Sequence, residues 1–260
     1  MPVDPVVVAA LSDLAAGLQA LGVGFCVIGA LVPEVLLEEP PTTRTNDADA
    51  TVVVDTLDEF ERVKMQLEEF GFRRTRRPCR LTHKSGGWVD LIPYSRTLAP
   101  TGRLELSDEV TFNLAGFEMI MPNAVDVMVS PDLGVPMVPV ALYVLLKIVA
   151  YGDRKEWTDL GSVLHCLRHY RESDDARYGL EHQGELVPYE YTTACLLGLD
   201  ARPFAASVAT SVRAVLNLFD GPDAPIVGLV ALENRRLLVE DGDHEEVYTL
   251  FRWFRLAAGV

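Results

Sequence analysis

Residues 45–54 read TNDADATVVV, a run in which two aspartates one residue apart lead into β-branched side chains. The apolar, β-branched end of this run predicts a buried strand. Because alternate side chains of a strand project from the same face, we expect Asp47 and Asp49 to converge while Ala48 points the other way. An ionised carboxylate in so apolar a setting is costly unless a positive charge neutralises it. The run therefore predicts a strand whose two carboxylates share a cation.

A second apolar segment carries one more carboxylate. Residues 88–94 read WVDLIPY and follow residues 79–84 across a Ser-Gly-Gly connection at 85–87, which predicts a β-hairpin. Three aspartates, with Asp90 the third, suit one or two hard cations with oxygen ligands, Mg²⁺ or Mn²⁺, that carry nucleotide phosphates. Each motif taken alone has an alternative interpretation. The D-x-D motif could cap a turn or face solvent, and Asp90 could face water on an edge strand.

A glycine turn precedes these carboxylates. Residues 25–31 read FCVIGAL, which predicts a strand that enters a helix through Gly29. Such a turn lets backbone N–H groups and the positive end of a helix dipole approach a phosphate. The alternative is that Gly29 only ends the strand.

The order of the predicted elements indicates an α+β fold: a small mixed β-sheet core with flanking helices, then a mainly helical C-terminal part. The corresponding domains are residues 1–138 and 139–260. Hydrophobic spacing predicts helices at residues 5–21, 57–70, 140–151, 157–172, 189–199, 204–219 and 245–257.

Charge argues against broad nucleic-acid binding, and no DNA partner is expected. The net charge is −15, with −4 in residues 1–100 and −11 in the rest. One stretch departs from this balance, since residues 73–80 read RRTRRPCR directly before the Asp90 strand. It suits a triphosphate or an RNA backbone. It equally suits a solvated basic edge strand that discourages aggregation.

Other features place the protein in the cytoplasm. The first four residues, MPVD, lack the basic start of a signal peptide. The uncharged stretch at 133–146 is short and contains prolines, so no membrane span is expected. The four cysteines form no C-x-x-C pair and are expected to be reduced thiols. His165 and His169 have the i, i+4 spacing of some zinc sites, but no third ligand is evident and a structural role is favoured.

Four motifs in this order resemble the nucleotidyltransferase superfamily with the polymerase-beta-type core, specifically the AbiEii-like and MenT-like toxin nucleotidyltransferases. The resemblance covers roughly residues 20–172. The motifs are IGA at 28–30, TNDAD at 45–49, VDLIPY at 89–94 and KIVAYGDR at 147–154.

The resemblance implies a metal-dependent nucleotidyltransferase that moves an NMP from an NTP to an RNA, tRNA among the candidates, or to a protein. It also implies a toxin–antitoxin pairing with a cognate antitoxin, and a helical domain that contributes to the nucleotide site. Its implied catalytic and metal-binding residues are Asp47, Asp49 and Asp90, and its implied nucleotide-binding residues are Gly29, Ala30, Thr45, Lys147 and Asp159.

Departures from the family pattern leave a second interpretation open. Relatives commonly have Gly-Ser or Gly-Gly where this chain has Gly29-Ala30, and of their K-D-x-x-D helix motif only Asp159 carries over. The alternative is a degenerate nucleotidyltransferase that binds a nucleotide or a protein without turnover.

Overall fold

The computed structural model describes residues 3–41, 45–107, 110–238 and 244–260. The chain forms two compact units, one of Met1–Val35 with Arg44–Pro139 and one of Leu36–Thr43 with Val140–Val260. The sequence did not predict that residues 36–43 belong to the second unit. The α+β class predicted from the sequence is confirmed.

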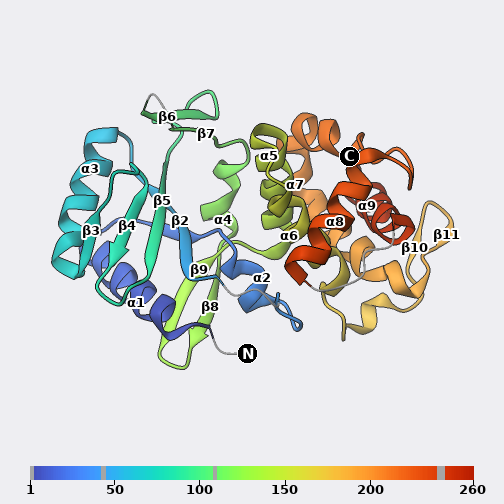
Figure 1. Ribbon diagram of the computed structural model, residues 1–260, viewed down its shortest axis with the longest axis horizontal. Helices are drawn as coiled ribbons and strands as arrows, with labels where there is room; N and C mark the ends of the chain where they lie inside the picture. Colours follow the sequence, from blue (N-terminus) through green and yellow to red (C-terminus); the bar gives the residue numbers. More distant parts are fainter. Residues whose placement is uncertain (1–2, 42–44, 108–109, 239–243) are drawn as a thin grey trace. The chain divides into compact units, whose positions relative to one another are not determined.

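The first unit is built on a seven-stranded mixed sheet with the strand order β3-β4-β5-β2-β1-β9-β8 (Figure 1). The pairs β2–β5 and β1–β9 are parallel, and the other neighbours are antiparallel. The strands are β1 Phe25–Val27, β2 Asp47–Val53, β3 Phe72–Arg74, β4 Arg80–His83, β5 Trp88–Tyr94, β8 Val125–Ser130 and β9 Leu133–Met137.

One face of this sheet is closed by helix α1, Pro5–Ala20, which packs on β2, β5 and β9. The α1 helix begins after Asp4, whose carboxylate accepts the N–H of Val6 at 2.8 Å, and Pro5 supplies a favourable first position. Across the strands, Leu81, Val89 and Ala48 lie in register on the covered face and are all at most 1% exposed. Alternation therefore assigns the neighbouring residues of these strands to the opposite face.

The first unit also contains a second long helix and several shorter elements. Helix α3, Leu57–Gln66, is capped by the Thr56 hydroxyl, which accepts the N–H of Glu59 at 3.1 Å. A 3₁₀ turn, Leu67–Phe70, follows and ends at Gly71, whose φ of 91° suits a residue without a side chain. Shorter elements complete the unit: helices α2 Leu31–Leu36 and α4 Ile120–Asn123, the 3₁₀ turn Phe117–Met119, and the separate hairpin of β6 Arg103–Ser107 and β7 Val110–Asn113.

The second unit is mainly helical, as the sequence predicts beyond residue 139. Its helices are α5 Val140–Arg154, α6 Trp157–His169, α7 Thr192–Leu216, α8 Pro225–Leu238 and α9 His244–Ala258. Its smaller elements are the hairpin of β10 Glu181–His182 and β11 Glu185–Leu186, and the 3₁₀ turns Asp175–Arg177 and Tyr189–Tyr191.

Two helix predictions in this unit are wrong. The two helices predicted at 189–199 and 204–219 are one helix, α7, which continues through Pro203. Helix α8 was not predicted, although Pro225 occupies a first position that favours helix. In α7, tertiary packing overrides the local breaker: a Cβ atom on Gly198 would lie 2.5 Å from the Phe254 carbonyl oxygen, so α7 and α9 pack almost backbone to backbone.

Within the described part of the chain, no helix combines the length and the apolar character that a membrane span requires.

Candidate metal centre

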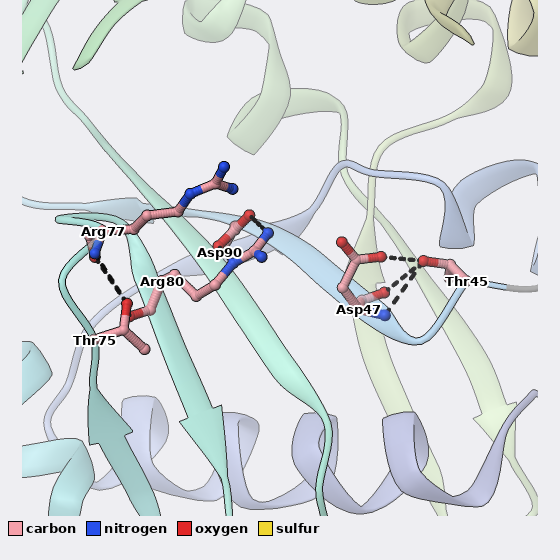
Figure 2. Close-up of polar contacts among 6 residues, drawn as sticks. All are labelled: Thr45, Asp47, Thr75, Arg77, Arg80 and Asp90. Atoms are coloured by element: carbon pink, nitrogen blue, oxygen red, sulfur yellow. Dashed lines mark hydrogen bonds and ion pairs between the residues drawn. The ribbon is translucent and has the colours of Figure 1, made fainter. Parts of the chain in front are cut away.

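Three carboxylates meet on the face of the sheet opposite α1. Parallel pairing of β2 with β5 sets Asp49 directly opposite Asp90, and Asp47 lies two residues earlier on the same face. One carboxylate oxygen from each of the three side chains lies within 4.8 Å of the other two, and each residue is half-buried. Figure 2 shows Asp47 and Asp90 on neighbouring strands. The structure thus brings together all three carboxylates that the sequence singled out, while their role as metal ligands stays a prediction.

Gly29 makes room for Asp49. A Cβ atom on Gly29 would lie 1.9 Å from Asp49 Oδ2 and 2.6 Å from Asp49 Cβ, so no larger residue fits there without moving the carboxylate. The Ile28 N–H donates to the Asp49 carbonyl at 2.9 Å, which fixes the glycine turn against β2. Sequence reasoning expected this glycine to cradle phosphate. The structure shows a second, steric reason for it, and Ala30 beside it is exposed.

Thr45 holds the first carboxylate from the loop before β2. Its hydroxyl donates to a carboxylate oxygen of Asp47, and Thr45 Oγ1 accepts the Asp47 N–H at 3.3 Å (Figure 2). The Thr45 N–H in turn reaches the buried Glu34 carboxylate at 3.4 Å. Thr45 therefore orients Asp47, and its contact with a nucleotide stays a prediction.

Arg80 binds the third carboxylate and was missed as a site residue. Its Nε donates to Asp90 Oδ1 at 2.8 Å and its Nη2 to Asp90 Oδ2 at 2.6 Å, a bidentate pair (Figure 2). The guanidinium also lies over the Trp88 ring, 5.2 Å from its centre. The hydrogen bond to Asp90 raises the pKa of Arg80, and the negative charges of Asp90 and Asp47 raise it further. The hairpin itself was the available signal, because counting back from its turn pairs residue 80 with residue 90.

Lys147 and Asp159 lie together in the second unit. Asp159 is fully buried, accepts from Lys147 Nζ at 3.0 Å, and receives a bidentate pair from Arg154 at 2.6 and 2.7 Å. Burial raises the pKa of Asp159, but the Arg154 hydrogen bonds and the Lys147 charge outweigh it and leave this pKa below its usual value. The predicted contact of both residues with a nucleotide stays a prediction.

The histidine pair of α6 gains carboxylate neighbours in the structure. His169 Nδ1 lies 3.2 Å from Glu172 Oε2 and 3.6 Å from Glu39 Oε2. His165 Nε2 lies 2.9 Å from the Glu39 carbonyl oxygen. These contacts attach Glu39 to α6. One ligand atom from each of Glu39, His169 and Glu172 lies within 4.8 Å of the others, so the structure brings carboxylates to His169 that the sequence did not reveal, and the structural role stays a prediction.

Comparison with models of protein families finds no match, and no curated protein matches the sequence. Among solved structures, an antigenic nucleotidyltransferase-like protein from Paracoccidioides brasiliensis is similar with a TM-score of 0.44 and 16% identity, over 82% of this chain and 95% of that chain. The CdnE cyclic dinucleotide synthase of Elizabethkingia meningoseptica, a structure with GTP and Apcpp, has a TM-score of 0.32 and 14% identity over 100% and 96% of the two chains. At these values the similarity assigns no activity, substrate or metal to this chain.

The steric role of Gly29 gives a direct test. Gly29→Ala is expected to push the Asp49 carboxylate aside, to weaken Mn²⁺ binding about 10-fold to 100-fold, and to lower the free energy of unfolding by about 1 to 3 kcal/mol. Titration calorimetry and chemical denaturation measure the two effects. Gly221→Ala is the matched control, because a Cβ atom there meets nothing within 4 Å. Equal Mn²⁺ affinity in both variants would show that Asp49 is not a ligand.

Proposed function

We propose that this protein is a nucleotidyltransferase that uses Mg²⁺ or Mn²⁺ to move an NMP from an NTP to a hydroxyl of an RNA or protein acceptor. The observation that carries the proposal is the convergence of Asp47, Asp49 and Asp90, with ligand oxygens within 4.8 Å, in the motif order of the superfamily. A purely structural role would not require three partly exposed carboxylates to share one face.

The donor set fits a hard divalent cation. All three side chains offer carboxylate oxygens, which Mg²⁺ and Mn²⁺ prefer, and the cluster contains neither a thiolate nor an imidazole. Asp47 and Asp49 would hold the metal, and Asp90 would complete the set. When bound, such ions stabilise the attacking and leaving oxygens of a phosphoryl displacement.

The chain's own residues have separable tasks in this reaction. The acceptor hydroxyl oxygen forms a bond to the α-phosphorus as the bond to the β-phosphate oxygen breaks, and pyrophosphate leaves. Asp90 would either share the second ion or accept the hydroxyl proton as a general base. The bidentate contact from Arg80 orients the Asp90 carboxylate, while Thr45 orients Asp47.

Two finer parts of the proposal rest on the resemblance. One is a toxin role with a cognate antitoxin, of the AbiEii-like or MenT-like kind. The other is the contribution of the helical domain through Lys147, with the buried Asp159 holding that lysine in place. A second candidate function, nucleotide or partner binding without turnover, is favoured by Ala30, because an exposed methyl group stands where relatives carry a hydroxyl or a second glycine.

Transfer is tested with each of the four NTPs labelled at the α-phosphate, incubated with Mg²⁺, the full chain and either total RNA or cell lysate. We expect label to appear on an RNA or a protein, and only with divalent cation. NTP binding without labelled product would favour the second candidate. Absence of both binding and product would overturn the proposal.

Arg80 supplies a further expectation. Arg80→Gln is expected to lower the unfolding free energy by about 1 kcal/mol without divalent cation, since the pair is partly exposed and solvent screens it. Mg²⁺ is expected to raise the melting temperature more in this variant than in the parent, because the three carboxylates then lack their neutralising guanidinium. Arg74→Gln, which breaks an exposed pair with Glu68, is the control and should leave both measurements unchanged. If Mg²⁺ raises the melting temperature equally in the parent and in Arg80→Gln, then Arg80 does not influence cation binding.

A further inference from the structure

The basic stretch 73–80 divides into two groups once its strands are paired. Arg73 lies opposite Thr82, and Thr82 lies opposite Trp88, so Arg73 shares the face that carries the three carboxylates. Arg74 lies opposite Leu81 on the face covered by α1, and its Nε donates to Glu68 at 2.7 Å. The position of β3 at the edge of the sheet explains a basic strand there as protection against edge pairing, but it does not explain the arginines beyond the strand.

Arg76 and Arg77 lie in the ordered turn between β3 and β4. Thr75 fixes this turn: its hydroxyl donates to the Arg80 carbonyl oxygen at 3.1 Å and accepts the Arg77 N–H at 3.1 Å. In Figure 2 the Arg77 side chain extends from the turn toward the Arg80–Asp90 pair. The turn thus directs the Arg77 guanidinium toward Asp90, the carboxylate proposed to accept a proton.

The arginine cluster, defined as Arg73, Arg76 and Arg77, is a group of exposed positive charges. All three residues are exposed, and among the residues that the structure describes no ion pair or hydrogen bond engages their guanidinium groups. The chain as a whole carries a net charge of −15, so exposed positive charges gathered in one stretch are exceptional in it. Such a cluster suits an anionic partner.

We propose that the arginine cluster binds the phosphodiester backbone of an RNA acceptor and delivers one of its ribose hydroxyls to Asp90. Guanidinium forks bind phosphate oxygens in pairs. In RNA every ribose hydroxyl lies a few bonds from a phosphate. An RNA could therefore place a phosphate on the arginine cluster and a hydroxyl at Asp90 at the same time. An acidic protein would satisfy the charge but does not couple each negative group to a nearby hydroxyl. The inference rests on the proposed function for the reaction, but RNA binding is measured without turnover.

The test is fluorescence anisotropy of a labelled single-stranded RNA of mixed sequence with the full chain, across a series of salt concentrations. The variant Arg73→Gln/Arg76→Gln/Arg77→Gln is expected to bind at least about 10-fold more weakly. The slope of log affinity against log salt concentration should be smaller in magnitude by about 2 in this variant. Each phosphate contact on a single strand contributes about 0.7 to that slope, and three arginines are replaced. The matched control is Arg74→Gln, an arginine of the same stretch on the opposite face, which should bind RNA like the parent.

Each other outcome overturns the inference. Equal RNA binding by the triple variant, or equal weakening by Arg74→Gln, would remove the specific role of the cluster. Displacement of RNA by poly-glutamate of matched charge would indicate an acidic protein partner, and tighter binding of DNA of the same sequence would exclude an RNA-specific acceptor. Loss of NTP binding in the triple variant would assign the cluster to the triphosphate. Asp49→Asn should bind RNA normally while failing to transfer, so failure of the proposed function is distinguished from failure of this inference.

Discussion

Asp49→Asn is expected to lower nucleotidyl transfer by about 10³-fold or more, equivalent to about 4 kcal/mol of transition-state stabilisation. The carboxylate lies between its two partners, opposite Asp90 in the sheet and two residues from Asp47, so its neutralisation weakens the whole cation site. Asparagine occupies nearly the same volume, and Gly29 still gives it room. The rate of label transfer from α-labelled NTP measures the effect.

The same variant separates loss of function from loss of fold. Because neutralising one of three close carboxylates relieves their repulsion, Asp49→Asn should melt at the same or a higher temperature than the parent without metal. The parent should gain stability from Mg²⁺ with NTP, and the variant should gain none. A variant that transfers nucleotide at the parental rate would exclude Asp49 from the metal centre.

Asp159→Asn is expected to lower the free energy of unfolding by about 3 kcal/mol near pH 7, because it leaves the Lys147 and Arg154 charges without their buried partner. The partners keep the pKa of Asp159 below its usual value, despite the opposing effect of burial. A lowered folded-state pKa stabilises the fold above the unfolded-state value, about 4, and that contribution is lost as the pH falls through the folded-state pKa. The difference between parent and variant should therefore shrink in acid.

Urea denaturation at several pH values measures this difference. Asp223→Asn, at an exposed position of the same unit, is the control and should change little at any pH. A loss in Asp159→Asn that stays constant down to acid pH would show that the ion pairs are not its cause.

The carboxylate cluster was largely predictable because its geometry follows from short-range rules. A strand places Asp47 and Asp49 on one face by its two-residue period, and the glycine-rich turn at 85–87 fixes the hairpin that carries Asp90. The parallel register that sets Asp49 opposite Asp90 is a long-range pairing, and periodicity alone does not determine it. The same holds for the packing of Asp49 against Gly29.

The features that could not be predicted depend on partners distant in sequence. Pro203 reads locally as a helix breaker, yet α7 runs through it because its other residues pack against α5 and α9. Gly221 and Pro222 read as punctuation, and this concealed the start of α8 at Pro225. Lys147 reads as a lysine in an apolar helix until Asp159, on the next helix, is seen to hold it.

The central claim is that Asp47, Asp49 and Asp90 hold divalent cations that carry a nucleotide's phosphates. Crystals grown with Mn²⁺ and a non-hydrolysable NTP, measured at a wavelength where manganese scatters anomalously, test it most directly. The account predicts anomalous peaks within coordinating distance of Asp47 and Asp49, with the triphosphate bound to the same ions. Anomalous peaks only at other places would contradict it. So would the absence of peaks in a structure where Arg80 still binds both carboxylate oxygens of Asp90.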